Sequence, residues 1–358
     1  MDLPVMPPVS PMLAKINDQM PRGEGWLYEP KWDGFRAIVF RDGDEIHVGS
    51  RDGKALERYF PELVPTLAAA LPPRCVIDGE VVVPGAEGLD FGALLQRIHP
   101  ARSRIEKLAA ETPGSFVAFD VLALGDDDLT TRPLEERRAR LAAELDGRAM
   151  PLDRTTARKA RRAKATALFG RDRGSRVHLT PQTDEPDLAM VWFDRFEDIG
   201  LDGLIVKRRD LLYRPGDRAM VKFKHHRSAD CVVGGYRLSK TGDGVGSLLL
   251  GLYDSGGVLH YVGHTSSFKA KERRALLEQL RELEGGTSFG TGRTPGGPSR
   301  WAAATASEWT PLEPRLVCEV RFDYLQGDRF RHAATFVRWR DDRDPRSCTF
   351  DQLASSSG

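Results

Sequence analysis

The residues best suited to chemistry lie in the run EPKWDGFR at positions 29–36. Lys31 follows an apparent strand and stands beside Asp33-Gly34, a turn pair that can hold a side chain at the mouth of a pocket. An amine held in this way can act as a nucleophile. Taken alone the motif is weak, because a surface lysine before an ordinary hairpin turn has the same pattern. Its meaning depends on the blocks that follow it along the chain.

Further blocks place charges and one aromatic ring at the ends of apparent strands: Ser50–Gly53, Val76–Val81, Ala118–Leu122, Asp202–Lys207 and Val221–Lys224. Lys222 and Lys224 are two residues apart, so on a strand both face one side. Each block alone is compatible with turn acids, a core aromatic or a solvated strand edge. Together they supply several cations, several acids and a stacking ring. That set suits a nucleoside triphosphate with a divalent metal ion.

In order and spacing, the blocks resemble the six motifs of the covalent nucleotidyltransferase superfamily, which includes ATP-dependent DNA ligases, RNA ligases and mRNA capping enzymes. The resemblance covers nearly the whole chain, with a degenerate sixth motif in Arg331–Asp342. The last third looks like the barrel domain of bacterial repair ligases. The chain as a whole most resembles the short ATP-dependent bacterial type called ligase C.

The resemblance implies a three-step reaction in DNA repair and recombination. Lys31 would attack the α-phosphate of ATP to give a lysyl-AMP; the AMP would pass to the 5′-phosphate of a nick in double-stranded DNA; and the 3′-OH would then displace it. A free lysine has a pKa of about 10.4, so making it neutral near pH 7.4 costs about 4 kcal/mol. Positive charge from Lys222, Lys224 and a metal ion would lower that pKa.

The resemblance also implies a role for each motif residue. Glu29 would lie near the adenine, Arg36 near the ribose, and Arg51 near ribose or phosphate. The two faces of the adenine would stack on Phe119 and Ile205. The metal ion, Mg²⁺ or Mn²⁺, would be held by Glu80 and Asp202. The remaining ATP contacts would be cations on the phosphates: Lys207, Lys222, Lys224 and, in the first step, Arg340.

Two motifs depart from the family pattern. Asp202 stands where the fourth motif usually begins with a glutamate, which is one methylene longer. In the sixth motif Ala333 replaces a usual proline, and the spacing to Arg340 is one residue longer than usual.

One segment, residues 153–176, is strongly basic. As a helix it would carry positive charge over most of its surface and could contact DNA phosphates. The residues proposed for that contact are Arg158, Lys159, Arg161, Arg162 and Lys164. A solvated surface insertion fits the same composition, so both interpretations stay open.

The first part of the chain is predicted to contain short strands with turn residues between them, among them Cys75–Asp78, Glu80–Val83 and Phe116–Val121. Helical patterns cover Pro61–Leu71, Ala93–Ala109 with a break at Pro100, and Pro133–Leu145. Adjacent strands with tight turns favour antiparallel sheets. We therefore expect an α+β domain over residues 1–226, built on antiparallel sheets with flanking helices; the resemblance implies that this is the adenylyltransferase domain.

From about Asp230 the chain consists of short strands joined by Gly, Asp and Ser turns, interrupted by a charged helix over Lys269–Leu283. Five or so strands plus one helix suit a small closed barrel such as an OB-fold. The second domain is expected over residues 227–358.

Composition excludes several other classes. With 358 residues the chain is long enough for two domains. It has 53 basic and 52 acidic side chains, so its net charge does not indicate a class of binding partner. No run is apolar enough to cross a bilayer and the N-terminus has no secretory pattern. The four cysteines lack zinc-site spacing and are expected to be buried free thiols. A bacterial cytoplasmic protein, associated with the nucleoid and monomeric, is the expectation.

Alternatives remain within and outside the superfamily. An RNA ligase or a capping guanylyltransferase would share the Lys31 motif. A non-catalytic nucleic-acid-binding barrel protein would keep the second domain and lose the chemistry. NAD-dependent ligases carry a zinc-binding cysteine cluster, which the cysteine spacing excludes.

Overall fold

A computed structural model describes residues 1–86, 88–150, 176–195, 200–225, 227–239, 241–290, 294–295, 308–323 and 325–355. The chain divides into two compact units, Met1–Lys224 and His225–Gly358. No helix in the described ranges has both the length and the apolar character needed to span a membrane.

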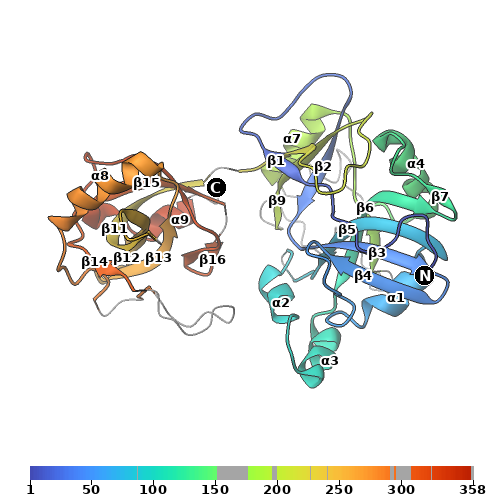
Figure 1. Cartoon of the computed structure of the whole chain (residues 1–358), viewed down its shortest axis with the longest axis horizontal. Coiled ribbons are helices and arrows are strands. Elements are labelled where there is room, and N and C mark those ends of the chain that lie inside the picture. Colours follow the sequence, from blue (N-terminus) through green and yellow to red (C-terminus); the bar gives the residue numbers. More distant parts are fainter. Residues whose placement is uncertain are drawn as a thin grey trace. The chain divides into compact units, whose positions relative to one another are not determined.

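The first unit contains two sheets (Figure 1). The smaller sheet has the strand order β1-β10-β9-β2, with bounds Ala14–Ile16, Met220–Phe223, Leu201–Arg208 and Trp26–Trp32. The larger has the order β4-β3-β5-β6-β7, with bounds Glu45–Ser50, Phe35–Asp42, Arg74–Val82, Ser115–Leu124 and Asp127–Asp128. A further strand, β8 (Val177–Leu179), pairs with β6.

The helices described in this unit are α1 Leu63–Ala70, α2 Phe91–Gln96, α3 Arg102–Glu111, α4 Leu134–Glu144 and α7 Pro186–Arg195. The predicted break at Pro100 is confirmed, since α2 ends before this proline and α3 begins after it. The antiparallel prediction holds except at two pairs, β1 with β10 and β6 with β8, which are parallel. The sequence pattern did not indicate β1, β8 or α7.

One strand prediction was wrong. The two strands expected over Cys75–Asp78 and Glu80–Val83 form the single strand β5, which runs through Gly79 and pairs with β3 without interruption. Gly79 is not a turn, because a Cβ there would lie 2.4 Å from the Phe116 ring on the neighbouring strand. Close packing, and not chain reversal, explains this glycine.

The two sheets of the first unit face each other across apolar side chains. Leu27 and Met220 of the smaller sheet share a buried cluster with Ile38, Phe40 and other residues of the larger one. The other face of the larger sheet packs against its helices through a second buried cluster. The turn from β2 to β3 carries the chain from one sheet to the other. At Gly34 in this turn a Cβ would lie 2.3 Å from the Val81 carbonyl oxygen, so only glycine allows that approach.

The second unit is built on the strand order β13-β12-β11-β15-β18. The bounds of these strands are Leu259–Thr265, Val245–Tyr253, Arg227–Leu238, Val317–Phe322 and Thr335–Trp339. The shorter elements are β14 Thr310–Pro311, β16 Leu325–Gln326, β17 Arg329–Phe330, the 3₁₀ turn Pro345–Ser347 and α9 Asp351–Ser355. The predicted helix is confirmed as α8, Ala270–Arg281.

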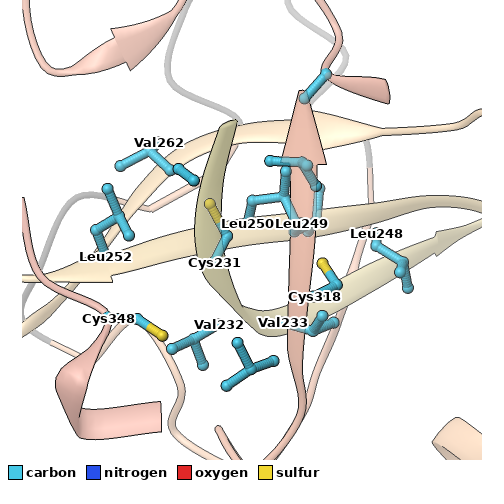
Figure 2. Close-up of a cluster of buried hydrophobic side chains, with 14 of the residues drawn as sticks. Cys231, Val232, Val233, Leu248, Leu249, Leu250, Leu252, Val262, Cys318 and Cys348 are labelled. Atoms are coloured by element: carbon cyan, nitrogen blue, oxygen red, sulfur yellow. The ribbon is translucent and has the colours of Figure 1, made fainter. Parts of the chain in front are cut away.

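The core of the second unit is apolar and holds three of the four cysteines (Figure 2). Cys231 and Cys318 stand opposite each other on β11 and β15, and Cys348 is buried in the same cluster. The prediction of buried free thiols is confirmed for all four. Burial raises the pKa of the Cys348 thiol to about 11 and of Cys75 to about 12, so these thiols stay protonated and unreactive.

A buried ion pair ties helix α4 to strand β6. The Arg137 guanidinium donates from Nε and Nη2 to the two Asp120 carboxylate oxygens, each at 2.8 Å, and both residues are almost completely buried. Arg137 also donates from Nη1 to the carbonyl oxygens of Arg132 and Leu211. Asp120, which the sequence places beside Phe119, therefore has a structural partner.

We expect Arg137→Met to lower the free energy of unfolding of the first unit by about 3–5 kcal/mol, because it leaves the Asp120 carboxylate buried and unpaired. Arg140→Met is the matched control, since Arg140 lies on the same helix in an exposed pair with Asp127 and should cost about 1 kcal/mol or less. Urea titration followed by circular dichroism measures both. Equal losses for the two variants would show that the buried pair is not stabilising.

Candidate active site

Three strands of the smaller sheet align charged and apolar side chains in one row. Glu29 on β2 stands opposite Ile205 on β9, which stands opposite Lys222 on β10. Opposed residues in neighbouring antiparallel strands project from the same face. That face borders a cavity of about 220 Å³, which the larger sheet also lines. The sequence-predicted residues that line it are Glu29, Lys31, Arg36, Arg51, Glu80, Phe119, Ile205, Lys207 and Lys222.

A bulge in β9 brings Lys31 against Asp202. Pro30 pairs with Leu204 and Trp32 with Leu201, so the single residue Lys31 opposes both Asp202 and Gly203. Gly203 has a φ of +118°, and a Cβ there would lie 2.2 Å from the Phe223 carbonyl oxygen. Only glycine tolerates both conditions. The bulge therefore depends on Gly203 and points Asp202 at the lysine.

Two lysines share one oxygen of Asp202. Lys31 Nζ lies 2.8 Å and Lys224 Nζ 2.6 Å from Asp202 Oδ2. Burial alone would lower the pKa of Lys31, but the carboxylate of Asp202, helped by Asp33 and Glu80, more than offsets this and raises it. Burial would raise the pKa of Asp202, and the two ammonium groups instead hold it below its usual value.

The expectation that neighbouring cations lower the pKa of Lys31 is therefore wrong for the protein by itself. The cations are present, but Asp202 lies between Lys31 and Lys224 and dominates. Lys222 behaves differently. Burial, and then the charges of Lys224 and Lys31, lower its pKa. The resting site thus holds Lys31 as an ammonium paired with Asp202, a form with no lone pair for nucleophilic attack.

A second bulge directs Phe119. On β6, Ala118 pairs with Gly79 and Asp120 with Asp78, so Phe119 is an extra residue without an opposite partner. Its ring borders the cavity, with the Arg36 guanidinium carbon 4.5 Å and Lys207 Nζ 4.9 Å from the ring centroid. Both bulges of this site thus lie at functional candidates.

Arg36 is held by Asp78 in a two-point ion pair. Nε and Nη2 of Arg36 donate to the two Asp78 carboxylate oxygens, each at 2.6 Å. The Tyr213 hydroxyl donates to Asp78 Oδ2, also at 2.6 Å, and Met12 in the N-terminal arm accepts from Arg36. These contacts fix the guanidinium at the wall of the cavity.

Glu29 and Lys207 form a buried ion pair, with Oε2 and Nζ 2.7 Å apart. The other Glu29 oxygen, Oε1, accepts from Gln182 Nε2 at 2.7 Å. Lys207 was expected to contact phosphates; the structure places it on Glu29, the residue expected near the base.

Glu80 lies opposite Arg36 in the sheet and borders the cavity. Burial raises its pKa to about 7, although Arg36 and Lys31 pull the pKa down. Among the described residues there is no cluster of three or more His, Cys, Asp or Glu side chains that could form a complete metal site. Glu80 and Asp202 both act electrostatically on Lys31, and two such partly buried carboxylates fit a divalent ion that completes its shell with phosphate oxygens and water.

Asp202 and Lys224 do not line this cavity themselves; Asp202 contacts Lys31, which does, and Lys224 contacts Asp202. The remaining predicted residues belong to other parts of the chain. Arg340 belongs to the second unit, where it forms ion pairs with Asp230 and Asp342. The five residues proposed to contact DNA, between Arg158 and Lys164, lie outside the described residues.

Other residues of the site carried no usable sequence signal. Gln182 and Tyr213 occur in ordinary-looking loop sequence, and Arg218 borders the cavity from a segment that no motif covers. Asp78 belongs to a motif, but its pairing with Arg36 depends on the register of β3 and β5.

Comparison with known proteins gives consistent matches. The family model for the ATP-dependent DNA ligase domain matches residues 11–224, and the model for the C-terminal region of ATP-dependent DNA ligases matches residues 241–343. DNA ligase C1 of Mycolicibacterium smegmatis is 49% identical over 99% of this chain and 96% of its own length. DNA ligase C of Mycobacterium tuberculosis is also 49% identical over the same shares.

A solved structure from a study of Lig E DNA ligases is 18% identical, covers 92% of this chain and 99% of its own, and has a TM-score of 0.52, which supports the fold alone. The near-complete coverage by the family models and the relatives, together with a partly buried lysine that borders a cavity, leads to one assignment. The chain belongs to the ATP-dependent DNA ligase family, and within it to the bacterial ligase C type.

Proposed function

We propose that this enzyme seals 5′-phosphate/3′-OH nicks in double-stranded DNA through an AMP bound covalently to Lys31. The observation that carries the proposal is the position of Lys31: it borders the cavity, is bonded to Asp202 and has Lys224 on the same carboxylate oxygen. An amine that only stabilised the fold would not need a cavity in front of it.

In the first step, the Lys31 amine attacks the α-phosphorus of ATP. A P–N bond forms, the bond to the β-phosphate oxygen breaks, and pyrophosphate leaves with the electron pair. The attack needs a neutral amine, so Lys31 must give up a proton and leave Asp202. Lys222, whose pKa is lowered, and Lys224 supply positive charge for the transferring phosphoryl group.

The other residues of the cavity suit the nucleoside. The Phe119 ring and the Ile205 side chain offer two apolar surfaces for the adenine. Glu29 would contact the polar edge of the base, and Arg36 and Arg51 would contact the ribose and phosphates. We assign Lys207 to the base end, with Glu29, in place of the phosphates. Mg²⁺ or Mn²⁺ held by Glu80 and Asp202 would neutralise charge on the phosphates.

We further propose that the second unit is an OB-fold. Strands β13, β12, β11, β15 and β18 follow one another in the sheet, and a parallel bridge between Thr265 and Ala334 joins its two edges. Helix α8 lies between β13 and β15 in sequence. Five strands in a nearly closed sheet, with a helix between the third and the fourth, is the arrangement of that barrel; the short strand β14 adds to it by pairing with β11. Through Arg340 this unit would orient the pyrophosphate in the first step.

We expect Lys31→Ala to abolish covalent labelling by ATP carrying a radioactive α-phosphate, because no other amine of the site can replace it. Lys15→Ala, at an exposed position of strand β1 at the other edge of the same sheet, is the control and should label normally. A denaturing gel measures the label, after removal of any bound AMP with pyrophosphate. The label should chase into sealed product when nicked DNA is added.

Labelling of Lys31→Ala at the wild-type level would contradict the assignment of the nucleophile. Labelling of the wild type by GTP in preference to ATP would move the proposal to a capping enzyme. No label with either nucleotide would favour a non-catalytic DNA-binding protein.

We expect Asp202→Asn to lower the pKa of Lys31, because the carboxylate that raises this pKa is removed while the positive charge of Lys224 remains. Only a neutral amine reacts with an acylating reagent, so the pH midpoint of Lys31 modification, followed by mass spectrometry, should move to lower pH. Asp210→Asn, in an exposed pair with Arg208, should leave the midpoint unchanged. An unchanged or higher midpoint in Asp202→Asn would contradict the ion-pair account.

A further inference from the structure

Gln182 lies behind the nucleotide cavity, at a position that no motif covers. Its side-chain amide donates to Glu29 Oε1 at 2.7 Å, while Lys207 donates to Oε2 at the same distance. Gln182 does not border the nucleotide cavity in the described part of the chain; it borders a separate cavity of about 590 Å³. It therefore contacts Glu29 without bordering the nucleotide cavity itself, so its contact with that cavity runs through the carboxylate.

The backbone around Gln182 is fixed independently of the side chain. Thr183 exchanges two backbone hydrogen bonds with Tyr28, the residue before Glu29, at 2.8 and 3.0 Å. Thr180 accepts from the Trp32 indole at 2.8 Å through its hydroxyl and from the buried Arg138 guanidinium through its carbonyl. These contacts hold the segment against β2, so the Gln182 amide meets Glu29 with little loss of freedom.

The two donors occupy one acceptor position on each Glu29 oxygen. A carboxylate oxygen has two lone pairs, so among the residues that the structure describes one acceptor position on each Glu29 oxygen has no donor, and Glu29 also borders the nucleotide cavity. Such a group accepts from the 6-amino group of adenine. It repels the 6-oxo group of guanine, which is itself an acceptor.

We propose that Gln182 is a positioning residue that makes the site selective for a 6-aminopurine nucleotide, by holding the Glu29 carboxylate with free acceptor positions directed at the base. The inference rests on the proposed function, since it takes the cavity to be the ATP site. Lys207 alone would leave the carboxylate free to rotate about its bond to the ammonium group. The second contact, at the other oxygen, fixes the plane of the carboxylate.

The test compares ATP with purine riboside triphosphate, which lacks only the 6-amino group. In Gln182→Leu the KM for ATP in the labelling reaction should rise about tenfold with kcat changed less than about twofold, since about 1.4 kcal/mol of binding to the amino group is lost. The KM for purine riboside triphosphate should stay nearly constant. The preference for ATP over this analogue should thus fall about tenfold.

Asp184→Asn is the matched control, because Asp184 lies two residues away and pairs with Arg209, not with Glu29. It should leave both KM values unchanged. Gln182→Glu, which places a second carboxylate against Glu29, should lose the preference at neutral pH and regain part of it at lower pH.

An equal rise in KM for both nucleotides in Gln182→Leu would overturn the proposal, because it would indicate a general structural role. An unchanged preference in Gln182→Leu would overturn it as well. Failure of the proposed function gives a different result: the wild type itself would not be labelled by ATP at Lys31.

Discussion

The shared oxygen of Asp202 is the interaction on which the site depends. Two ammonium groups at 2.8 and 2.6 Å from one carboxylate oxygen can coexist away from water only because that oxygen lies between them. The arrangement stores Lys31 in the protonated form, which is unreactive, and directs it at the same time. A ligand that moves the Asp202 carboxylate away from Lys31 leaves this amine next to the positive charges of Lys222 and Lys224, which favour its neutral form. In the proposed function, activation of Lys31 is therefore coupled to occupation of the site.

The backbone supplies this geometry through irregular pairing. A regular ladder in β2 and β9 would place a single residue opposite Lys31, and the bulge at Asp202-Gly203 places two there. The bulge at Phe119 does the same for the aromatic ring on the larger sheet. Both sheets thus depart from regular pairing where they face the cavity. The loss of regular strand pairing is confined to the bulges, because the sheets still contribute to the buried apolar clusters beside them.

Ion pairs that differ in solvent exposure have different roles in this unit. Arg137 and Asp120 are almost completely buried, do not border the nucleotide cavity, and join a helix to a strand. Arg36 with Asp78, and Lys207 with Glu29, each have one partner or both at the cavity wall, so the same kind of contact orients groups toward a ligand. Lys31 with Asp202 is the most exposed of these pairs and the one that has to open.

The sequence by itself determined the ATP-dependent ligase class and the mixed α+β architecture, and it proposed which lysine, acids and aromatic ring form the site. Those features depend on which residue types follow one another along short strands, and this order can be read directly from the sequence. It did not determine that Asp202 raises the pKa of Lys31, that β5 runs through Gly79, that Lys207 meets Glu29, or that Gln182 takes part at all. Each of these depends on strand register, bulges or the meeting of segments more than 100 residues apart in the chain, as for Gln182 and Glu29 with a separation of 153. Contacts of that kind form only when the two sheets and their loops pack together, so only the tertiary structure decided them.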